Sequence, residues 1–214
     1  MDAITLNDVL PRAFAASGAA GSDVWNREVA FGRGRFYLVE AQSGAGKSSL
    51  CAYLMGYRDD YSGSICFDGR DVRRLGIAEW SAVRRGQLSC LFQELRLFPE
   101  LTAWENVELK NGLTHRQGRK KVEAWFERLG IADKLDVPVA RLSFGQQQRV
   151  AAIRSLAQPF SFLLADEPVS HLDDANAAAL AGIVAEEAAS QGAGVVVTSV
   201  GRRLPLDFDQ VLRL

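Results

Sequence analysis

Residues 36–55 read Phe36-Tyr37-Leu38-Val39-Glu40-Ala41-Gln42-Ser43-Gly44-Ala45-Gly46-Lys47-Ser48-Ser49-Leu50-Cys51-Ala52-Tyr53-Leu54-Met55, and they decide the fold. An apolar run, a glycine-rich stretch and a helix-compatible segment follow one another, which predicts a buried strand, a turn and a helix. Successive backbone N–H groups in such a turn form an anion-binding concavity, and the free N–H groups of the helix start point the same way. The stretch therefore predicts a phosphate-binding loop.

The side chains at the end of this loop suit a nucleotide with Mg²⁺. We expect Lys47 to reach the β- and γ-phosphates and the Ser48 hydroxyl to hold the metal ion. The full pattern is Gly-x-x-x-x-Gly-Lys-Ser/Thr, and Ala41 stands at its first position. Alanine lets the turn close if its φ is negative. The loop residues predicted to bind nucleotide are Ala41, Gln42, Ser43, Gly44, Ala45, Gly46, Lys47, Ser48 and Ser49.

Composition and charge disfavour several other classes of protein. The chain has 214 residues, 48% of them hydrophobic, which is enough for a substantial core. Lys and Arg number 25 against 26 Asp and Glu, so the net charge of −1 gives no electrostatic footprint for nucleic acid. A short basic cluster at 116–121 is interpreted as a solvated helix start. We expect no nucleic-acid partner.

Cysteine usage and hydropathy bear on the compartment. Cys51, Cys66 and Cys90 are odd in number and lie in apolar stretches, which predicts buried thiols in a reducing compartment. Residues 1–5 lack the basic segment and apolar run of a secretion signal, and no apolar run approaches 18 residues. Any membrane role is therefore expected to go through a partner.

Strand patterns alternate with helix patterns over most of the chain. Four short apolar runs are typical of strands buried on both faces: 36–39, 88–92, 160–165 and 195–198. The alternation predicts an open, mostly parallel α/β sheet. Residues 94–159 break it with helices alone, two of which begin with capping boxes at Thr102 and Ser143. Residues 18–22 look like a loop.

Two adjacent carboxylates, Asp166 and Glu167, follow the apolar run at 160–165. They come at the carboxyl end of the expected strand, where open α/β sheets bind ligands. Adjacent strand residues point opposite ways, so we expect Asp166 to orient the Mg²⁺ shell. Glu167 is then expected to face the attacking water as general base or water-positioning residue.

The order and spacing of these and further motifs resemble those of the ATP-binding cassette (ABC) ATPases over nearly the whole chain. Leu91-Phe92-Gln93-Glu94 resembles the Q-loop, and Ser170-His171-Leu172-Asp173 resembles the D-loop. Val196-Val197-Thr198-Ser199 stands where the strand that carries the family's switch histidine ends. The signature segment, usually Leu-Ser-Gly-Gly-Gln, is matched by Leu142-Ser143-Phe144-Gly145-Gln146-Gln147-Gln148-Arg149-Val150.

The resemblance implies a fold: an α/β, RecA-like P-loop NTPase core with a small N-terminal antiparallel β portion and an inserted α-helical subdomain. We predict one ABC ATPase domain at 1–214, with the core at 1–92 and 159–214. The helical subdomain, with the Q-loop and the signature motif, is expected at 93–158. ATP and Mg²⁺ are the implied ligands, with Gln93 beside Ser48 and Asp166 at the metal. Glu167, Gln93 and Ser199 occupy catalytic positions.

The resemblance further implies a head-to-tail dimer with a second ATPase subunit, in the simplest case a homodimer. Each ATP then lies between one subunit's phosphate loop and the other subunit's signature helix, whose N-terminus offers backbone donors and a favourable dipole. The Ser143 hydroxyl has two expected roles that can alternate, as donor to the γ-phosphate and as helix cap. The residues expected to act in trans are Ser143, Phe144, Gly145, Gln146 and Asp173.

Several positions depart from the family pattern. Phe144 replaces the first signature glycine, and Ser199 replaces the histidine that touches the γ-phosphate. His171 is a catalytic candidate that would supply the missing imidazole, to the opposite site; the alternative is a polar interface residue at a position often taken by asparagine. Glu40 stands where an apolar residue is expected, so we expect it to have a partner or to lie at the surface.

Two contact sites stay open at the level of sequence. The adenine is expected to stack on Phe14, with Trp25 as the second candidate, and a core position for Phe14 is an equal alternative. The resemblance also implies a groove that receives a cytoplasmic helix of a permease. Four residues lie in the right segment for that groove and fit a core position equally well: Leu95, Leu97, Phe98 and Leu101.

Residues 92–107 look most like the branch that works with lipoprotein-release and macrolide-export permeases. The implied function is an ATP-hydrolysing subunit that drives integral membrane permease subunits, cytoplasmic and peripheral on the inner face of the cell membrane. One alternative is an ABC ATPase that regulates a cell-envelope complex without transport. The other is a nucleotide-gated dimerising subunit with little hydrolysis, which Ala41, Phe144 and Ser199 suggest.

Overall fold

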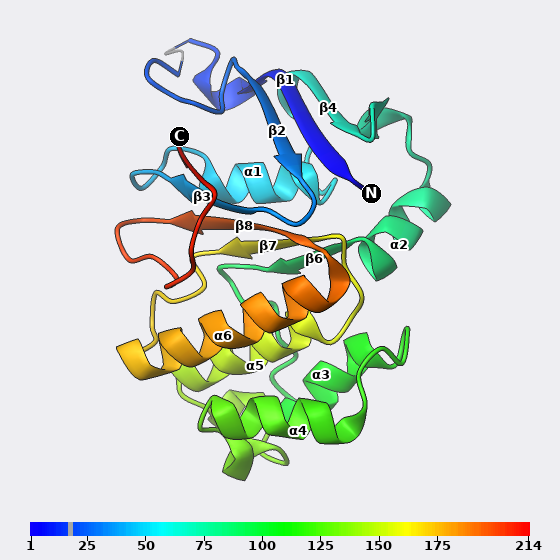
Figure 1. Cartoon of the computed structure of the whole chain (residues 1–214), viewed down its shortest axis with the longest axis vertical. Helices are drawn as coiled ribbons and strands as arrows, with labels where there is room; N and C mark the ends of the chain where they lie inside the picture. Colours follow the sequence, from blue (N-terminus) through cyan, green and yellow to red (C-terminus); the bar gives the residue numbers. More distant parts are fainter. Residues whose placement is uncertain (17–18) are drawn as a thin grey trace.

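A parallel sheet lies at the centre of the computed structural model, which describes residues 1–16 and 19–214 (Figure 1). Its strand order is β6-β7-β8-β3-β9. The register pairs Asp166 with Thr198 and Glu40 with Ser199. The carboxyl ends of three neighbouring strands therefore meet at one edge of the sheet. The strands are β3 (Phe36–Glu40), β6 (Leu88–Leu91), β7 (Phe162–Asp166), β8 (Gly194–Ser199) and β9 (Gln210–Arg213).

Four of these strands confirm the apolar runs in the sequence, with small shifts at their ends. The run at 160–165 becomes a strand only from Phe162 and continues to Asp166. The fifth strand, β9, had no counterpart among the expected strands, because three of its four residues are exposed and it forms an edge. The expected loop at 18–22 lies partly outside the described residues.

A smaller antiparallel sheet near the N-terminus confirms the expected β portion. It has the order β2-β1-β4-β5, formed by β1 (Ala3–Pro11), β2 (Glu28–Gly32), β4 (Tyr61–Phe67) and β5 (Arg70–Asp71). Helix α1 (Lys47–Leu54) lies between this sheet and the parallel one (Figure 1). Apolar side chains from both sheets and from α1 form one buried cluster, which includes Ile4, Leu6, Phe31, Leu50, Leu54 and Val196.

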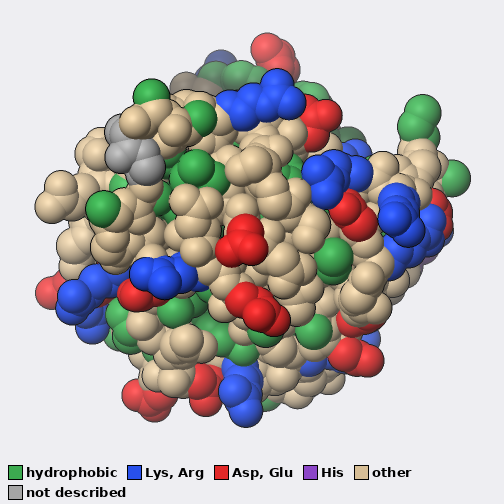
Figure 2. All heavy atoms as spheres, turned by 90° about the horizontal axis from the view of Figure 1, so that it is seen from above, with side chains coloured by type: hydrophobic (Ala, Val, Ile, Leu, Met, Phe, Trp, Pro, Cys, Tyr) green, Lys and Arg blue, Asp and Glu red, His purple; other side chains and the backbone are tan. Residues whose placement is uncertain are grey.

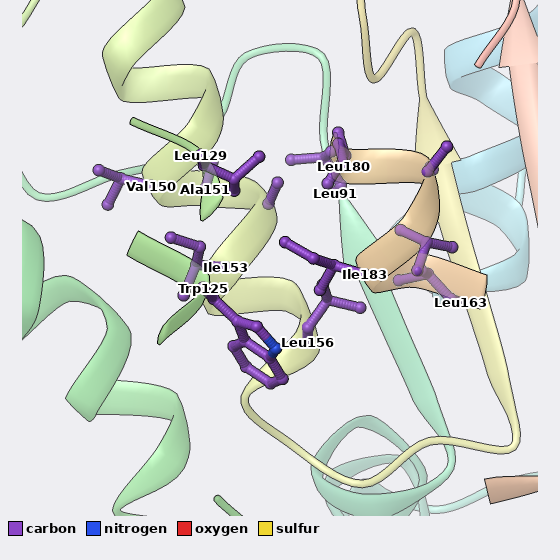
Figure 3. Close-up of a cluster of buried hydrophobic side chains, with 14 of the residues drawn as sticks. Leu91, Trp125, Leu129, Val150, Ala151, Ile153, Leu156, Leu163, Leu180 and Ile183 are labelled. Carbon is purple, nitrogen blue, oxygen red and sulfur yellow. The ribbon is translucent and has the colours of Figure 1, made fainter. Parts of the chain in front are cut away.

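Helices cover the other face of the parallel sheet (Figure 1). Helices α5 (Phe144–Leu156) and α6 (Asp174–Gln191) lie next to the strands, and α3 (Ala103–Asn111) and α4 (Arg119–Arg128) lie beyond them. Figure 3 shows the second buried cluster, in which Ile153 and Leu156 of α5 meet Ile183 of α6 and Trp125. Helix α2 (Ile77–Gly86) and four short 3-10 turns, Arg12–Phe14, Val72–Arg74, Ala132–Lys134 and Val139–Arg141, complete the elements.

The middle of the chain is helical, as expected. Within residues 94–159, all of which the structure describes, there is no strand and only an isolated bridge between Thr102 and Pro138. Both expected capping boxes are present, at Thr102 for α3 and at Ser143 for α5. The limits of a separate helical subdomain at 93–158 stay a prediction, since α5 shares its buried cluster with the sheet.

Charged side chains of both signs are mixed on the surface, and the three cysteines follow the expected burial only in part. On the face shown in Figure 2, Lys and Arg side chains are interspersed with Asp and Glu. The expectation of three buried thiols is right for Cys51 only, since Cys66 and Cys90 are half-buried. Among the described residues, no helix is long and apolar enough to cross a bilayer.

Candidate functional site

The predicted phosphate-binding loop joins β3 to α1 with the backbone that such a loop needs. Gly44 and Gly46 have φ of +83° and +96°, the left-handed region that favours glycine. Ala41 lies outside that region, so its methyl group introduces no strain. Lys47 begins α1 and is 5% exposed, with its Nζ donating to the carbonyl of Gln42 at 3.2 Å.

Three oxygen-bearing side chains from separate elements converge beside this loop. The Ser48 hydroxyl donates to Oδ2 of Asp166 at 2.7 Å and lies 3.2 Å from Oε1 of Gln93. The other carboxylate oxygen of Asp166 accepts a hydrogen bond from the buried Thr198 hydroxyl, which fixes the orientation of the carboxylate. The structure therefore brings Ser48, Gln93 and Asp166 together, and it adds a contact of Thr198 that the sequence analysis did not predict.

This group of oxygens is chemically suited to Mg²⁺. The ion prefers oxygen donors, uses few protein ligands and completes its shell with water and substrate phosphates. One hydroxyl, one carboxylate and one amide oxygen within hydrogen-bonding reach of each other satisfy that preference. Among the described residues no group of three or more His, Cys, Asp and Glu side chains could hold a metal ion, so a dedicated all-protein cage is absent there.

The second acidic residue, Glu167, is held in an uncommon backbone conformation. Its φ is +50°, which costs a non-glycine residue about 1 kcal/mol. Three hydrogen bonds hold it: its N–H donates to the carbonyl and hydroxyl oxygens of Thr198, and its carbonyl accepts from Nε2 of Gln148 at 3.1 Å. The carboxylate lies 3.6 Å from Nζ of Lys47. Strained residues that the surroundings fix in this way cluster at functional sites.

The signature segment forms the start of α5, as its capping box predicts. The Ser143 hydroxyl accepts a hydrogen bond from the backbone N–H of Gln146 at 3.3 Å, while Oε1 of Gln146 accepts from the N–H of Ser143. Phe144 is 47% exposed at this helix start. Its ring meets that of His171 edge-on, with centroids 4.4 Å apart. The two unusual side chains of the signature and the D-loop are thus in contact within one subunit.

The D-loop packs closely on the start of α5. A Cβ at Gly145 would come within 2.9 Å of the carbonyl oxygen of His171, so glycine is needed there for close approach. Oε1 of the buried Gln148 accepts from the N–H of His171. Asp173 caps α6 by accepting from the N–H of Asn176 at 2.7 Å, and this hydrogen bond holds the pKa of the Asp173 carboxyl below its usual value.

Ser199 ends β8, and its side chain makes a hydrogen bond within the chain. It is buried, and its hydroxyl donates to the carbonyl oxygen of Arg202 at 2.6 Å. Its own carbonyl accepts from the N–H of Ala41 at 3.1 Å, which joins the end of β8 to the start of the phosphate loop. Glu40 pairs with Arg203 at 2.6 Å, which confirms the expectation that this carboxylate has a partner.

Both aromatic candidates for adenine stacking lie against the phosphate loop. A Cβ at Gly46 would come within 3.1 Å of the Phe14 ring and 3.2 Å of the Trp25 ring. Trp25 is 2% exposed, and its indole N–H donates to the carbonyl of Ala45, so its face is committed to the core. Phe14 is only partly buried. Both rings line a cavity of about 260 Å³ together with Ala19, Ala20, Ser22, Ala45 and Leu214.

The segment after the Q-loop divides between core and surface. Leu95 is buried, Leu97 packs against the core, and Phe98 is 53% exposed. Leu95 and Arg96 have φ of +58° and +50°, and the Arg154 guanidinium donates to both of their carbonyl oxygens. Burial, assisted by the charge of Arg96, lowers the pKa of Arg154 to about 10. The signature helix therefore holds the chain that leaves the Q-loop.

The thiol of Cys51 lies one helical turn beyond Ser48. A hydrogen bond with Cys90, burial and the charge of Asp166 all raise the pKa of Cys51, so this thiol stays protonated. Cys90 lies on β6, three residues before Gln93. Cys51 belongs to the buried cluster that includes α1, and Cys90 packs against that cluster.

Comparison with known proteins agrees with this arrangement. Residues 26–170 match the family model described as ABC transporter, which is more than half of the chain. The chain belongs to the ABC transporter ATPase family. A dimeric structure of the ATP-binding cassette MJ0796, in a post-hydrolysis state with ADP and phosphate, superposes with a TM-score of 0.78 at 26% identity. That match covers 92% of this chain and 87% of the other.

Curated relatives include a macrolide-export protein and a lipoprotein-release protein, the two kinds of system named for the branch that residues 92–107 resemble. The macrolide export ATP-binding/permease protein MacB 1/2 of Paracoccus denitrificans is 36% identical over 186 residues, which are 86% of this chain and 28% of the relative. The lipoprotein-releasing system ATP-binding protein LolD of Aquifex aeolicus is 39% identical over 148 residues, 67% of this chain and 66% of the relative. This ABC ATPase chain thus spans less than two thirds of the length of either relative.

Three residues with evident roles in the site were missing from the sequence-based candidates. Gln148 lies inside the quoted signature segment, and its buried side chain between Glu167 and the D-loop becomes evident only in three dimensions. Thr198 stands one residue before Ser199. Once Asp166 had been assigned to the site, the alternation of side chains along the neighbouring strand would have pointed to Thr198. Arg202 follows the last expected strand in a stretch without a recognisable motif.

Proposed function

We propose that this chain binds and hydrolyses ATP, dimerises when ATP is bound and so drives a separate membrane permease. The observation that supports this most is the convergence of Ser48, Gln93 and Asp166 beside a glycine-rich loop, with Lys47 and Glu167 next to it. These five side chains come from α1, the ends of β6 and β7, and the turns that follow. In phosphoryl transfer the protein supplies positioning and electrostatic stabilisation, which is what such a set offers.

Each residue of the site has a proposed part. The backbone N–H groups of residues 42–48 cradle the β-phosphate, and the Lys47 ammonium turns from Glu167 and the carbonyl of Gln42 to the β- and γ-phosphates. Ser48, Gln93 and Asp166 hold Mg²⁺, which neutralises phosphate charge when bound. Glu167 accepts the proton of the attacking water or orients it. Phe14 is the adenine-stacking residue, because Trp25 is buried.

The second half of each site is proposed to come from another copy of the chain. Ser143, Phe144, Gly145 and Gln146 begin α5, where backbone N–H groups and the helix dipole favour a γ-phosphate. The Ser143 hydroxyl caps this helix in the single chain and would turn to the phosphate in the dimer. Asp173, at the start of α6, would contact the partner. Because the similar cassette MJ0796 is dimeric, a homodimer is the simplest arrangement.

The relatives support the proposal of a permease partner, since their names include lipoprotein release and macrolide export. The exposed Phe98 and the neighbouring Leu97 are the proposed contact for a permease helix, whereas Leu95 belongs to the core. A peripheral position at the inner face of the cell membrane is part of the same proposal. Whether the assembly transports a substrate or regulates an envelope complex would then depend on the permease.

A nucleotide-gated subunit with little hydrolysis is the second candidate. The observation that favours it is Ser199, which carries no imidazole and whose hydroxyl is committed to the carbonyl of Arg202. This candidate predicts ATP binding and dimerisation with turnover that is slow even in the presence of the permease.

The experiment that tests nucleotide binding is the Lys47→Ala variant. Loss of the ammonium removes the charge that meets the phosphates, so ATP affinity should fall by a hundredfold or more, about 2.7 kcal/mol. Isothermal titration with ATP and Mg²⁺ measures the affinity, and circular dichroism checks the fold. The matched control is Lys110→Ala, which removes a half-buried lysine that donates to Oε1 of Gln158 and lies far along the chain from the loop. Unchanged affinity in folded Lys47→Ala protein would end the proposal.

A further inference from the structure

Arg202 makes an unusual set of contacts just after β8. Its guanidinium donates to the carbonyl oxygens of Val169 and Leu172, the first at 3.3 Å, and to Oδ1 of Asp174 at 2.6 Å. All three acceptors lie in or next to the D-loop, residues 170–173. One side chain from the segment that follows the switch position therefore spans the whole D-loop.

The carbonyl contacts matter more than the ion pair. Val169 and Leu172 are buried residues, and the Val169 carbonyl also accepts from the N–H of Leu172 at 3.3 Å. The Leu172 carbonyl is therefore the one that loses its described partner without Arg202, and a buried carbonyl without a partner costs about 1–3 kcal/mol. The Asp174 carboxylate is fully exposed, where an ion pair contributes little. The planar guanidinium fork suits several acceptors at fixed angles, and a lysine ammonium does not reproduce that geometry. Arg202 thus holds the D-loop backbone in one conformation.

The same segment is also joined to the phosphate loop. The carbonyl of Ser199 accepts from the N–H of Ala41, and Arg203 pairs with Glu40 directly before the loop. The Ser199 hydroxyl closes the turn by donating to the carbonyl of Arg202. Residues 199–203 therefore connect the start of the phosphate loop with the D-loop through named hydrogen bonds, and no contact of the Ser199 side chain with a phosphate is needed for that connection.

We propose that Arg202 is a positioning residue that couples the phosphate loop to the D-loop and so supports the chemistry of a chain that has serine at the switch position. The inference rests on the proposed function, since it concerns hydrolysis and dimer formation at that site. Among the described residues, the hydrogen bonds of the Arg202 guanidinium go to Val169, Leu172 and Asp174 and not to the phosphate loop. Its loss should therefore change turnover and dimerisation and leave ATP affinity in the single chain within about twofold.

The test compares Arg202→Gln with Arg128→Gln. Arg128 is a matched control because it forms a two-point ion pair with Glu186 between α4 and α6, and its side chain is 39% exposed against 40% for Arg202. Hydrogen–deuterium exchange of the peptide that covers residues 169–174 in the nucleotide-free chain reads the contact itself. ATP affinity and kcat measure the functional effect of losing this contact. Arg202→Lys tests whether a positive charge without the guanidinium geometry is enough to keep turnover.

The proposal expects faster exchange at 169–174 in Arg202→Gln and not in Arg128→Gln, together with a kcat about tenfold lower and an unchanged affinity for ATP. A tenfold change corresponds to about 1.4 kcal/mol in the barrier. In a Glu167→Gln background, Arg202→Gln should also weaken the ATP-dependent dimer. Arg202→Lys should recover less than half of the lost turnover.

Unchanged exchange at 169–174, or faster exchange with wild-type kcat, would overturn the inference. A parallel loss of ATP affinity and thermal stability would also overturn it, because that pattern indicates a general structural role. Failure of the proposed function is recognised separately, since wild-type protein would then show no ATP turnover and Glu167→Gln alone would form no dimer with ATP.

Discussion

At the scale of single residues, Glu167 shows how this fold maintains a strained conformation at its site. A φ of +50° is unfavourable for glutamate, yet the hydrogen bonds from Gln148 and to Thr198 leave the backbone little alternative. Gln148 comes from the signature helix, so the position of Glu167 depends on the same helix that is proposed to meet the partner's nucleotide. The carboxylate is therefore connected to the proposed dimer interface through one buried side chain.

His171 is the residue for which two interpretations predict opposite outcomes. Its ring packs on Phe144 and its N–H donates to Gln148, which favours a structural role at the proposed interface. We therefore expect His171→Asn to keep kcat within about twofold, measured by phosphate release. A role in supplying the imidazole that Ser199 lacks predicts instead that His171→Ala lowers kcat at least tenfold, about 1.4 kcal/mol, and that Ser199→His restores much of it.

At the scale of elements, the pairing of β1 with β4 carries an irregularity that depends on one glycine. The register shifts between Asn7 and Leu10, and Asp8 has a φ of +50°. Opposite this bulge, Gly63 has a φ of +78°, and a Cβ there would collide with the backbone oxygens of Asn7 and Asp8. A bulge of this kind bends its strand and increases the local twist.

This geometry predicts different effects for substitution of Gly63 in β4 and of Gly69 in the turn between β4 and β5. Gly63→Ala combines left-handed strain with a clash against backbone and should lower the free energy of unfolding by roughly 3 kcal/mol. The control Gly69→Ala has a similar φ of +81° but no atom within 4 Å of the added Cβ, so it should cost only about 1 kcal/mol. Urea denaturation of the three proteins measures both. Equal costs would show that strain alone decides, without the close approach.

The part of the site that could be predicted from the sequence lies in short, continuous motifs. Residues 36–55 encode strand, loop and helix within one short stretch, and Asp166 follows its own strand directly, so their meeting could be expected. The contacts of Arg202 join backbone groups 30 and 33 residues away, between turns that have no periodicity. Strand β9 was missed for a related reason, because only one of its residues is buried.

At the scale of the whole molecule, the parallel sheet separates two buried clusters. The cluster with α1 supports the phosphate loop, and the cluster with α4, α5 and α6 supports the signature helix (Figures 1 and 3). The end of β7 lies between them and carries Asp166 and Glu167. A single chain therefore presents its phosphate loop and its signature helix as separate sites, and two copies arranged head to tail would bring them together.

The measurement that tests this account most directly is light scattering of the Glu167→Gln variant with ATP and Mg²⁺. Replacing the carboxylate by an amide should slow hydrolysis strongly while leaving Lys47, Ser48 and Asp166 free to bind nucleotide, so the ATP-bound dimer should accumulate. The account predicts that the molar mass doubles when ATP is added and returns to that of the monomer with ADP. A monomer at saturating ATP, with turnover equal to that of the wild type, would contradict it.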